Sequence, residues 1–343
     1  MKTKVLNFTV ALVIATTIST SSLAQNRRRA AVPTKTKAPA KMENDLLAAL
    51  PASDAMALVN LHQLLFEGLP KILADNPAKQ AEANAEIDKF KARTGIDPRA
   101  FDQLALGMHY SYPREGITKV DTIGLARGSF NAAAFAAAGR AAAKGKYREE
   151  KYHGLTIYIF TLDQQLKIFG LLNLRVHDLA VSALGGSLLA LGNLAAVRGV
   201  IDMGKARAPG NAELITLASQ DPHALVGCGG NVTTSLLRNL NLDNNAIAKD
   251  VSTIRQVYGT VGLTEKDLEV FLTARATDAE SAKSLAETLQ GMSQLAAMFL
   301  GRLPVPKRAA AKTALDNLKI TTQGNELRIR TAVGQAQLGA LIG

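Results

Sequence analysis

The sequence predicts an α+β fold made of two tandem, related modules with largely antiparallel sheets and packed helices. Two observations support this prediction. Segments with apolar residues at every second position, which are typical of half-buried strands, occur in groups, and helical segments separate the groups. Short motifs of the first half also recur in the same order in the second half. A chain of 343 residues is long enough for about two domains of ordinary size.

The first 24 residues are expected to be a secretory signal peptide of bacterial type. Lys2 and Lys4 form a positive start, an apolar run follows over residues 5–18, and Ser22 and Ala24 are the small residues that signal peptidase requires. The apolar run is shorter than the ~20 residues of a membrane-spanning helix. We therefore expect cleavage after Ala24 and export to the periplasm or the cell exterior.

A basic tail over residues 25–42 is expected to be disordered, because Pro, Ala, Thr and basic residues dominate it and build no core. Its basic side chains are candidates for electrostatic binding to anionic lipid, lipopolysaccharide or an acidic polymer, and a solvated spacer is the alternative. These residues are Arg27, Arg28, Arg29, Lys35, Lys37 and Lys41. Without them and the two signal-peptide lysines, the formal charge of +11 falls to +3, which argues against a nucleic-acid-binding domain.

The first module is expected over residues 43–204. A short strand precedes two helices, of which the first has leucines near one face and the second ends at Gly95. Two alternating strands follow, then an alanine-rich helix capped by Asn131 and a hairpin that turns at His153 and Gly154. Strands are expected at 55–60, 101–111, 118–126, the two arms of 147–160, 166–176, 179–183 and 187–191, and helices at 61–74, 78–94 and 132–144.

A linker at 205–210 leads to the second module, residues 211–343, whose long helix is expected at 281–301. The ends of the two modules share an apolar-x-apolar strand, a glycine turn and a second strand. The matched positions are Leu179 with Leu318, Val181 with Ile320, Gly185 with Gly324 and Leu188 with Leu327. The starts of the modules share a second motif, residues 54–59 and 221–226. Duplication predicts equivalent sheet positions and both glycines in turns; the alternative is two unrelated regions with similar alternation.

Two further stretches carry a resemblance to other proteins. Residues 152–158, Tyr-His-Gly-Leu-Thr-Ile-Tyr, form an expected hairpin, and residues 191–197 lead from a strand into a helix. Both resemble recurrent motifs of a loose class of exported bacterial proteins of unknown function, which are built from repeated strand–helix–strand modules. The resemblance implies that fold and export, and it brings no activity or catalytic residue to this chain.

The sequence contains no local signature of a metal site or a catalytic site, and we expect neither a metal nor a cofactor. A single cysteine excludes an internal disulfide framework and a four-cysteine zinc site. The histidines lack the His-Glu-x-x-His spacing of a zinc protease, and no Gly-x-Ser-x-Gly elbow occurs. Cys228 lies in a glycine-rich stretch, residues 227–230, where we expect a close backbone approach or a bulge.

These observations predict an exported, non-catalytic protein that binds a ligand, a cell-envelope component or a protein partner. A large apolar cleft between the two modules would favour ligand binding. The alternative is an exported hydrolase whose nonlocal site forms near Cys228 from a distant histidine and carboxylate. Neither a specific nucleic-acid partner nor a transmembrane span after signal cleavage is expected.

Overall fold

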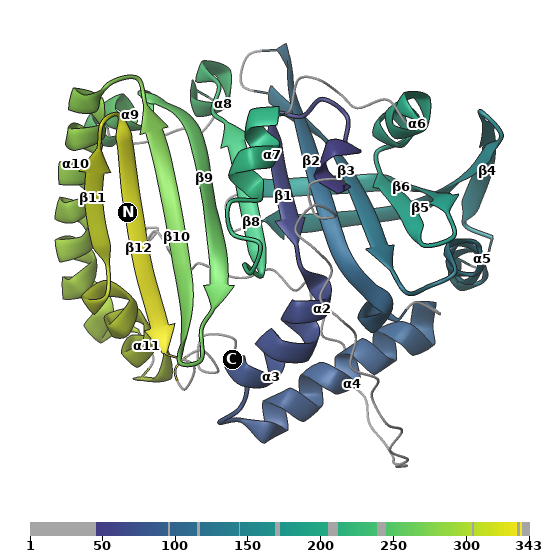
Figure 1. Cartoon of the computed structure of the whole chain (residues 1–343), viewed down its shortest axis with the longest axis horizontal. Coiled ribbons are helices and arrows are strands. Elements are labelled where there is room, and N and C mark those ends of the chain that lie inside the picture. Colours follow the sequence, from purple (N-terminus) through teal and green to yellow (C-terminus); the bar gives the residue numbers. More distant parts are fainter. Residues whose placement is uncertain are drawn as a thin grey trace, which may run out of the picture.

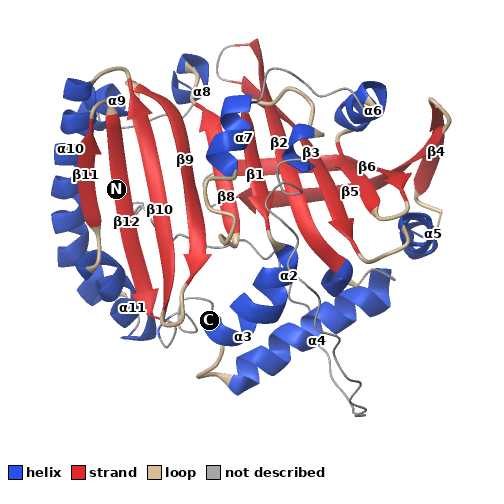
Figure 2. Cartoon of the chain, viewed as in Figure 1, coloured by secondary structure: helices blue, strands red, loops and turns tan. Residues whose placement is uncertain are grey.

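The computed structural model describes residues 46–94, 97–114, 117–143, 145–168, 172–204, 212–238, 245–303, 305–334 and 337. Their strands form one twelve-stranded antiparallel sheet, and helices pack on both of its faces (Figure 1, Figure 2). The prediction of an α+β fold with antiparallel strands and packed helices is confirmed. The signal peptide, the basic tail and the linker at 205–210 lie outside the described residues.

The sheet continues across the expected boundary between the modules. In sheet order its strands are β11 (Lys319–Gln323), β12 (Glu326–Gly334), β10 (Asp267–Ala276), β9 (Ile254–Leu263), β8 (Val226–Asn231), β1 (Ala55–Val59), β2 (Phe101–Arg114), β3 (Ile117–Gly128), β7 (Leu188–Gly192), β6 (Leu172–Gly185), β5 (Leu155–Ile168) and β4 (Tyr147–Tyr152). Outward from the β1–β8 pair, the order β2-β3-β7-β6 on one side parallels β9-β10-β12-β11 on the other. The shared motif at the module starts does not align the strands, because residues 54–59 cover β1 whereas residues 221–226 only reach the first residue of β8.

One of the two expected turn glycines is placed differently. Gly324, with a φ of 57°, lies in the turn between β11 and β12 as the sequence predicts. Gly185 is instead the last residue of β6, and Gly186 and Ser187 form the turn to β7. The pairing of β6 with β7 skips Leu184, so this bulge moves the turn one residue further along the chain.

The same bulge changes which strand positions correspond in the two hairpins. Val181 and Ile320 both belong to the fourth residue pair from the turn, as the motif predicts. In the second pair, however, Leu327 corresponds to Leu189 rather than to Leu188. The match of Leu188 with Leu327 is therefore wrong by one residue. The duplication itself stays a prediction.

Helices on the two faces of the sheet come from different parts of the chain. They are α2 (Leu61–Gln63), the π-helical turn η1 (Leu64–Gly68), α3 (Leu69–Ile72), α4 (Pro77–Thr94), α5 (Ala132–Ala143), α6 (Leu194–Met203), α7 (Ala212–Ala218), α8 (Thr234–Arg238), α9 (Asn245–Val251), α10 (Ala279–Phe299) and α11 (Val305–Asp316), with short 3₁₀ turns η2 (Pro98–Ala100) and η4 (Leu300–Arg302). Core contacts place α6 and α7 on one face, and α5 and α10 on the other. We call these the α7 face and the α10 face. No helix in the described ranges is long and apolar enough to cross a membrane.

Helix α7 packs closely on β8 because two glycines of that strand carry no side chain. A Cβ on Gly227 would lie 2.0 Å from the carbonyl oxygen of Ala218, and a Cβ on Gly229 would lie 2.9 Å from the Cβ of Leu217. The expected close backbone approach at this stretch is confirmed. Strand β8 pairs without interruption through both glycines, so the alternative of a bulge is wrong.

The two motifs that carry the resemblance form the expected local structures. His153 and Gly154, with φ angles of 46° and 80°, make the tight turn between β4 and β5. Asn193 is the residue before α6, and its side-chain oxygen accepts a hydrogen bond of 2.6 Å from the backbone of Thr122. Residues 166–176, expected as one strand, contribute instead to both β5 and β6, whose far ends cross behind β1 and β2 in Figure 1.

Candidate functional site

The α10 face of the central strands carries a continuous apolar surface. Residues directly opposite each other in antiparallel strands share a face, so the pairing defines three rows that run from β2 through β1, β8 and β9 toward β10. The rows are Leu104, Val59, Val226, Val261 and Val270; Leu106, Ala57, Cys228, Gly259 and Leu272; and Met108, Ala55, Gly230 and Val257. We call these residues the apolar strip. Five strands spaced ~4.8 Å apart make it about 19 Å wide.

Solvent reaches the apolar strip more than it reaches the residues beneath α7 on the opposite side of the same strands. On the α7 face, Met56, Leu58, Ala105 and Tyr258 are only 1%, 8%, 0% and 5% exposed. On the α10 face, every residue of the strip except Gly259 is only half-buried. A central strand that is covered on both sides buries both of its faces. The exposure of the strip therefore shows that its apolar side chains are incompletely covered.

The helices of the described chain cover the margins of the strip rather than its middle. Helix α5 packs on β5 and β6, α10 packs on β10, β11 and β12, and α2 packs on β2. Helix α7 packs on β1, β8 and β9, but from the opposite face. In Figure 1, α7 lies in front of β8, so the strip is turned away from the viewer, on the side where the far ends of β5 and β6 cross behind β1 and β2.

Small residues occupy the middle of the strip. Ala57, Cys228 and Gly259 follow one another along the second row, and Ala55 and Gly230 lie beside them in the third. Leucine and methionine side chains on β2 and leucine and valine side chains on β9 and β10 border them. The two glycines are close approaches rather than open positions, because a Cβ on Gly259 would lie 2.2 Å from the carbonyl oxygen of Phe271 and a Cβ on Gly230 would lie 2.9 Å from the Cβ of Ala55.

Hydroxyl groups lie at one end of the strip. Tyr110 follows Met108 by two residues on β2 and so lies on the same face, and Tyr112 follows by two more. The hydroxyl of Tyr112 pairs with that of Thr233, whose oxygen also accepts a hydrogen bond of 3.2 Å from the backbone of Leu236 at the start of α8. Burial first, and then the charge of Asp54 and the neighbouring Tyr112, raise the pKa of Tyr110, which therefore remains a neutral donor.

The surroundings of Cys228 favour binding over the chemistry of a nucleophile. Burial raises the pKa of its thiol, and a hydrogen bond with the backbone of Gly259 offsets only part of this effect. A thiol that stays protonated at neutral pH is a poor nucleophile. Its neighbours in the row, Ala57 and Gly259, carry no acid or base. His109, which contacts Asp54 at 2.8 Å, belongs to the α7 face because it lies two residues beyond Gly107 on β2.

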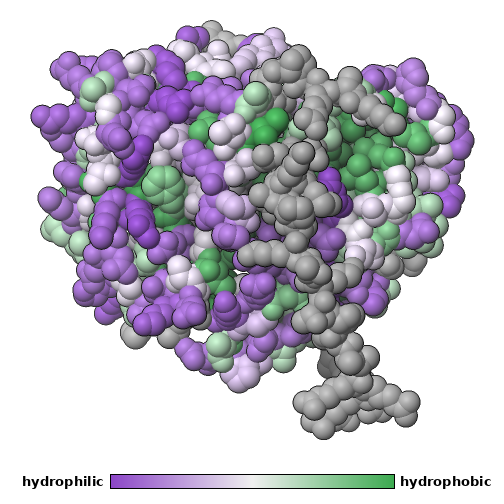
Figure 3. Space-filling model, viewed as in Figure 1, coloured by the Kyte–Doolittle hydropathy of each residue, from purple (hydrophilic) through white to green (hydrophobic). Residues whose placement is uncertain are grey.

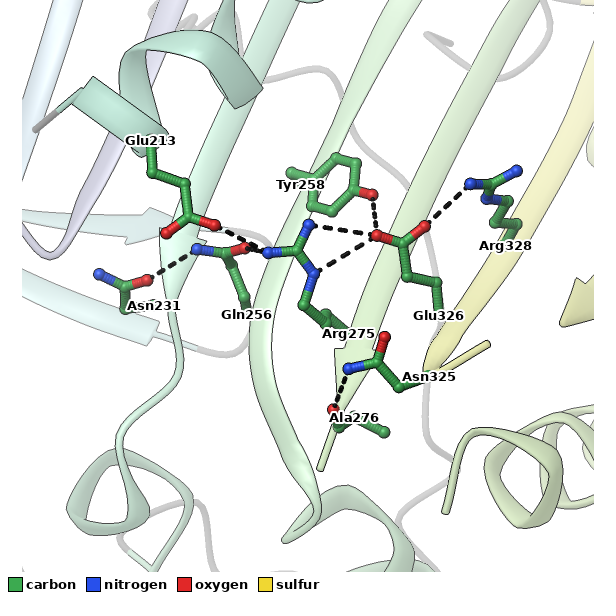
Figure 4. Close-up of polar contacts among 9 residues, drawn as sticks. All are labelled: Glu213, Asn231, Gln256, Tyr258, Arg275, Ala276, Asn325, Glu326 and Arg328. Atoms are coloured by element: carbon green, nitrogen blue, oxygen red, sulfur yellow. Dashed lines mark hydrogen bonds and ion pairs between the residues drawn. The ribbon is translucent and has the colours of Figure 1, made fainter. Parts of the chain in front are cut away.

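A polar network on the α7 face joins α7 to three strands (Figure 4). The guanidinium of Arg275 on β10 donates to Glu213 of α7 at 2.8 Å, to Gln256 of β9 at 2.7 Å and to Glu326 of β12 at 3.2 Å. The hydroxyl of Tyr258 donates to Glu326 at 2.8 Å, and Arg328 contacts the other oxygen of that carboxylate at 2.9 Å. Two arginines thus face two glutamates, and the network carries no net charge.

Hydrogen bonds stabilise the charged form of Glu326 in this network. Burial alone would raise the pKa of the carboxyl, but hydrogen bonds from Arg328, Tyr258 and Arg275 outweigh burial and hold the pKa below its ordinary value. Burial and the same bond to Glu326 raise the pKa of Tyr258, so its hydroxyl remains a donor. The charges of the network satisfy each other, which is the arrangement of a structural clamp rather than of a ligand site. The surface over β9 to β12 is predominantly hydrophilic in Figure 3.

The sequence-predicted binding residues do not form part of this site. Arg27, Arg28, Arg29, Lys35, Lys37 and Lys41 lie outside the described residues. The sequence of the expected strand at 101–111 did indicate part of the apolar strip. Side chains alternate between the two faces of a strand, so the residues at every second position share one face. These residues are Leu104, Leu106, Met108 and Tyr110. The sequence did not show which face a helix would cover. Among the described residues, no group of three or more His, Cys, Asp or Glu side chains is placed to hold a metal ion.

Comparison with known proteins identifies only distant similarity of shape. No family model matches the chain, and no curated protein matches it in sequence. Two crystal forms of TP0453, a treponemal protein, are each 12% identical to this chain with a TM-score of 0.45. The match with crystal form III covers 87% of this chain and 96% of the TP0453 chain. The match with crystal form IV covers 88% of this chain and 98% of the TP0453 chain. Crystal form I is 11% identical with a TM-score of 0.43 and covers 87% of this chain and 96% of its own. Similarity at this level carries no argument about function.

Proposed function

We propose that the chain is an exported, non-catalytic protein that binds an apolar small molecule on the apolar strip. One observation carries this proposal: the strands under α7 are buried on the α7 face but only partly buried on the α10 face, although both faces are apolar. Leaving apolar surface in contact with water costs about 25 cal/mol per Å². A ligand that covers the exposed part of the strip would recover this free energy.

The proposed ligand contacts a surface that is suited to binding rather than to catalysis. Leucine, valine and methionine side chains supply most of the contact area. Binding sites for small molecules are largely apolar with few polar groups, as here. The raised pKa of Cys228 weakens the alternative of a hydrolase at this position. In this proposal the basic tail holds the protein near an anionic surface, because its six cationic residues attract anionic lipid or polymer.

The fluorescent apolar probe N-phenyl-1-naphthylamine tests the proposed site. We expect saturable binding to the mature chain, and we expect bound probe to slow the reaction of Cys228 with methyl methanethiolsulfonate. Cys228 is the single cysteine of the protein, so this labelling rate reports directly on the middle of the strip. No saturable binding, or binding that leaves the labelling rate unchanged, would contradict the proposal. This measurement uses the unmodified chain and needs no variant to fold.

A pair of variants then locates the probe. Ala57→Phe fills the second row and is expected to weaken probe binding about tenfold, which corresponds to ~60 Å² of lost apolar contact. Thr321→Phe is the control, because it also adds a phenyl ring to a strand but lies exposed on edge strand β11, away from the strip. Equal affinities of the two variants, with both folded by their thermal midpoints, would show that the probe binds elsewhere.

Export is tested separately from binding. We expect the exported protein to begin at Gln25, because Ser22 and Ala24 supply the small residues of a cleavage site. N-terminal sequencing of protein recovered from the periplasm or the medium gives the result directly. An exported chain that still begins at Met1 would disprove cleavage at this position, and a chain found only inside the cell would disprove export.

A further inference from the structure

We infer that α10 pairs with α10 of a second copy of this chain, antiparallel and about a two-fold axis at Leu295. The inference does not depend on the proposed ligand. Its basis is an apolar patch at the end of α10, where Leu295, Met298 and Phe299 are 57%, 78% and 49% exposed. Residues three or four apart lie on one side of a helix, so the three side chains form a single surface. Helix α10 lies at the outer edge of the molecule in Figure 1.

The second half of α10 lacks the charges that a solvated helix carries. No charged residue occurs between Glu287 and Arg302, although every residue from 294 to 299 is exposed. Helix α4 of the same chain also has a largely exposed surface, and it contains seven charged residues among its 18. An exposed apolar patch with polar residues at its rim is typical of an interaction surface.

The sizes of the side chains make the patch complementary to itself. In an antiparallel pair, residues at equal distances from the axis lie opposite each other, so Phe299 of one copy meets Gly291 of the other. A Cβ at Gly291 would have nothing within 4 Å, which leaves room for a phenyl ring. Glycine is a poor helix former, and the space that it provides for Phe299 gives it a role inside α10.

The charges at the two ends of the patch are also complementary. Glu287 lies eight residues before Leu295 and Arg302 lies seven residues after it, so the antiparallel pair places Glu287 of each copy beside Arg302 of the other. Glu287 is 67% exposed and contacts Lys283 at 4.0 Å. Arg302 stacks on the ring of Phe299 at 4.8 Å and has no carboxylate partner among the described residues. A two-fold interface requires such a self-complementary surface.

The area of the patch predicts weak pairing. Its three apolar side chains expose roughly 300 Å² per copy, so the pair buries less than the ~1,200 Å² of a standard interface. We therefore expect a dissociation constant of about 10–100 µM. A lipid surface is the competing occupant of an exposed apolar helix. The observations favour the second copy, because Glu287 would repel an anionic lipid surface but meets a cation in the pair.

Sedimentation equilibrium of the mature chain between about 1 and about 500 µM tests the pairing. We expect reversible dimers, and we expect Met298→Glu to weaken them at least about tenfold, because it places a charge against apolar side chains. Ile117→Glu is the control, because Ile117 is 44% exposed on β3, in the other half of the sheet. A monomer at every concentration, or dimers that Met298→Glu leaves unchanged, would overturn the inference.

Charge reversal tests the direction of the pair. Glu287→Lys and Arg302→Glu should each weaken the dimer about fivefold, and the double variant should regain the lost affinity, because the same pair forms with its signs exchanged. Affinity that stays low in the double variant would exclude the antiparallel arrangement. Unchanged thermal midpoints establish that folded proteins are compared.

Cross-linking tests the position of the axis. Leu295→Cys should form a disulfide-linked dimer on oxidation, because the axis brings the two copies of this residue together. Gln290→Cys, which is exposed on another side of α10, should not, and both variants retain Cys228. Equal cross-linking of the two variants would overturn the assigned axis. Binding to anionic vesicles by a chain that stays monomeric would assign the patch to lipid instead.

Discussion

Replacing Gly227 with alanine is expected to destabilise the fold by about 3 kcal/mol, the upper range for overpacking a core. The added Cβ would lie 2.0 Å from the carbonyl oxygen of Ala218, and backbone in a packed helix cannot give way without a shift of the helix. Such a shift would also pull Leu214 and Leu217 away from the core of the α7 face, where they are 3% and 5% exposed. Urea unfolding at pH 7 measures the loss in the free energy of unfolding.

Gly291→Ala is the control for this experiment, because it makes the same chemical change in a different environment. Gly291 lies exposed within α10, and nothing lies within 4 Å of the position that a Cβ would occupy. Alanine forms helices better than glycine, so this variant is expected to gain ~0.5–1 kcal/mol. Equal effects of the two substitutions would mean that α7 does not pack on β8 as described.

Arg275→Met is expected to cost about 2 kcal/mol at pH 7, between the values for an exposed and a fully buried ion pair. Methionine keeps much of the length of arginine but removes the hydrogen bonds to Glu213, Gln256 and Glu326. Glu326 is only 15% exposed and would keep its charge with fewer donors. Thermal and urea unfolding both measure the loss.

Arg330→Met is the matched control for the loss of an arginine on the same face. Arg330 donates to both carboxylate oxygens of Glu269 at 3.0 Å, but the side chains of Arg330 and Glu269 are 60% and 36% exposed. Exposed pairs contribute little, so we expect a cost below about 1 kcal/mol. If the two variants lose the same stability, Arg275 does not hold a buried network.

The effect of Arg275→Met should depend on pH. The hydrogen bonds hold the folded-state pKa of Glu326 below its ordinary value of 4.5, so their contribution is fully present above that value and is lost as the pH falls through the folded-state pKa. In the variant, Glu326 has lost the hydrogen bonds from Arg275, so protonation of Glu326 lowers the free energy of unfolding by less than it does in the natural chain. The difference in unfolding free energy between the natural chain and the variant should therefore shrink between pH 5 and about pH 3. A difference that stays constant over this range would exclude Glu326 as its origin.

The local sequence contained most of the elements of this fold. Period-two alternation predicted strands such as 101–111, turn residues predicted the bend at His153 and Gly154, and the long apolar stripe predicted a helix at 281–301. Each of these signals depends on neighbouring residues alone. Where one residue was added, as at Leu184, the pattern of apolar residues did not reveal the bulge, and the prediction for Gly185 was wrong.

The tertiary structure alone decided how the halves combine and which faces are covered. β1 and β8 are separated by almost half of the chain, and no local pattern in either strand shows that they pair. Both faces of these strands are apolar or small, so the sequence did not show that α7 covers one of them and that the other is only partly buried. Coverage depends on the path of segments far away in the chain. For this reason the elements followed from the sequence, whereas the apolar strip followed only from the pairing of the strands.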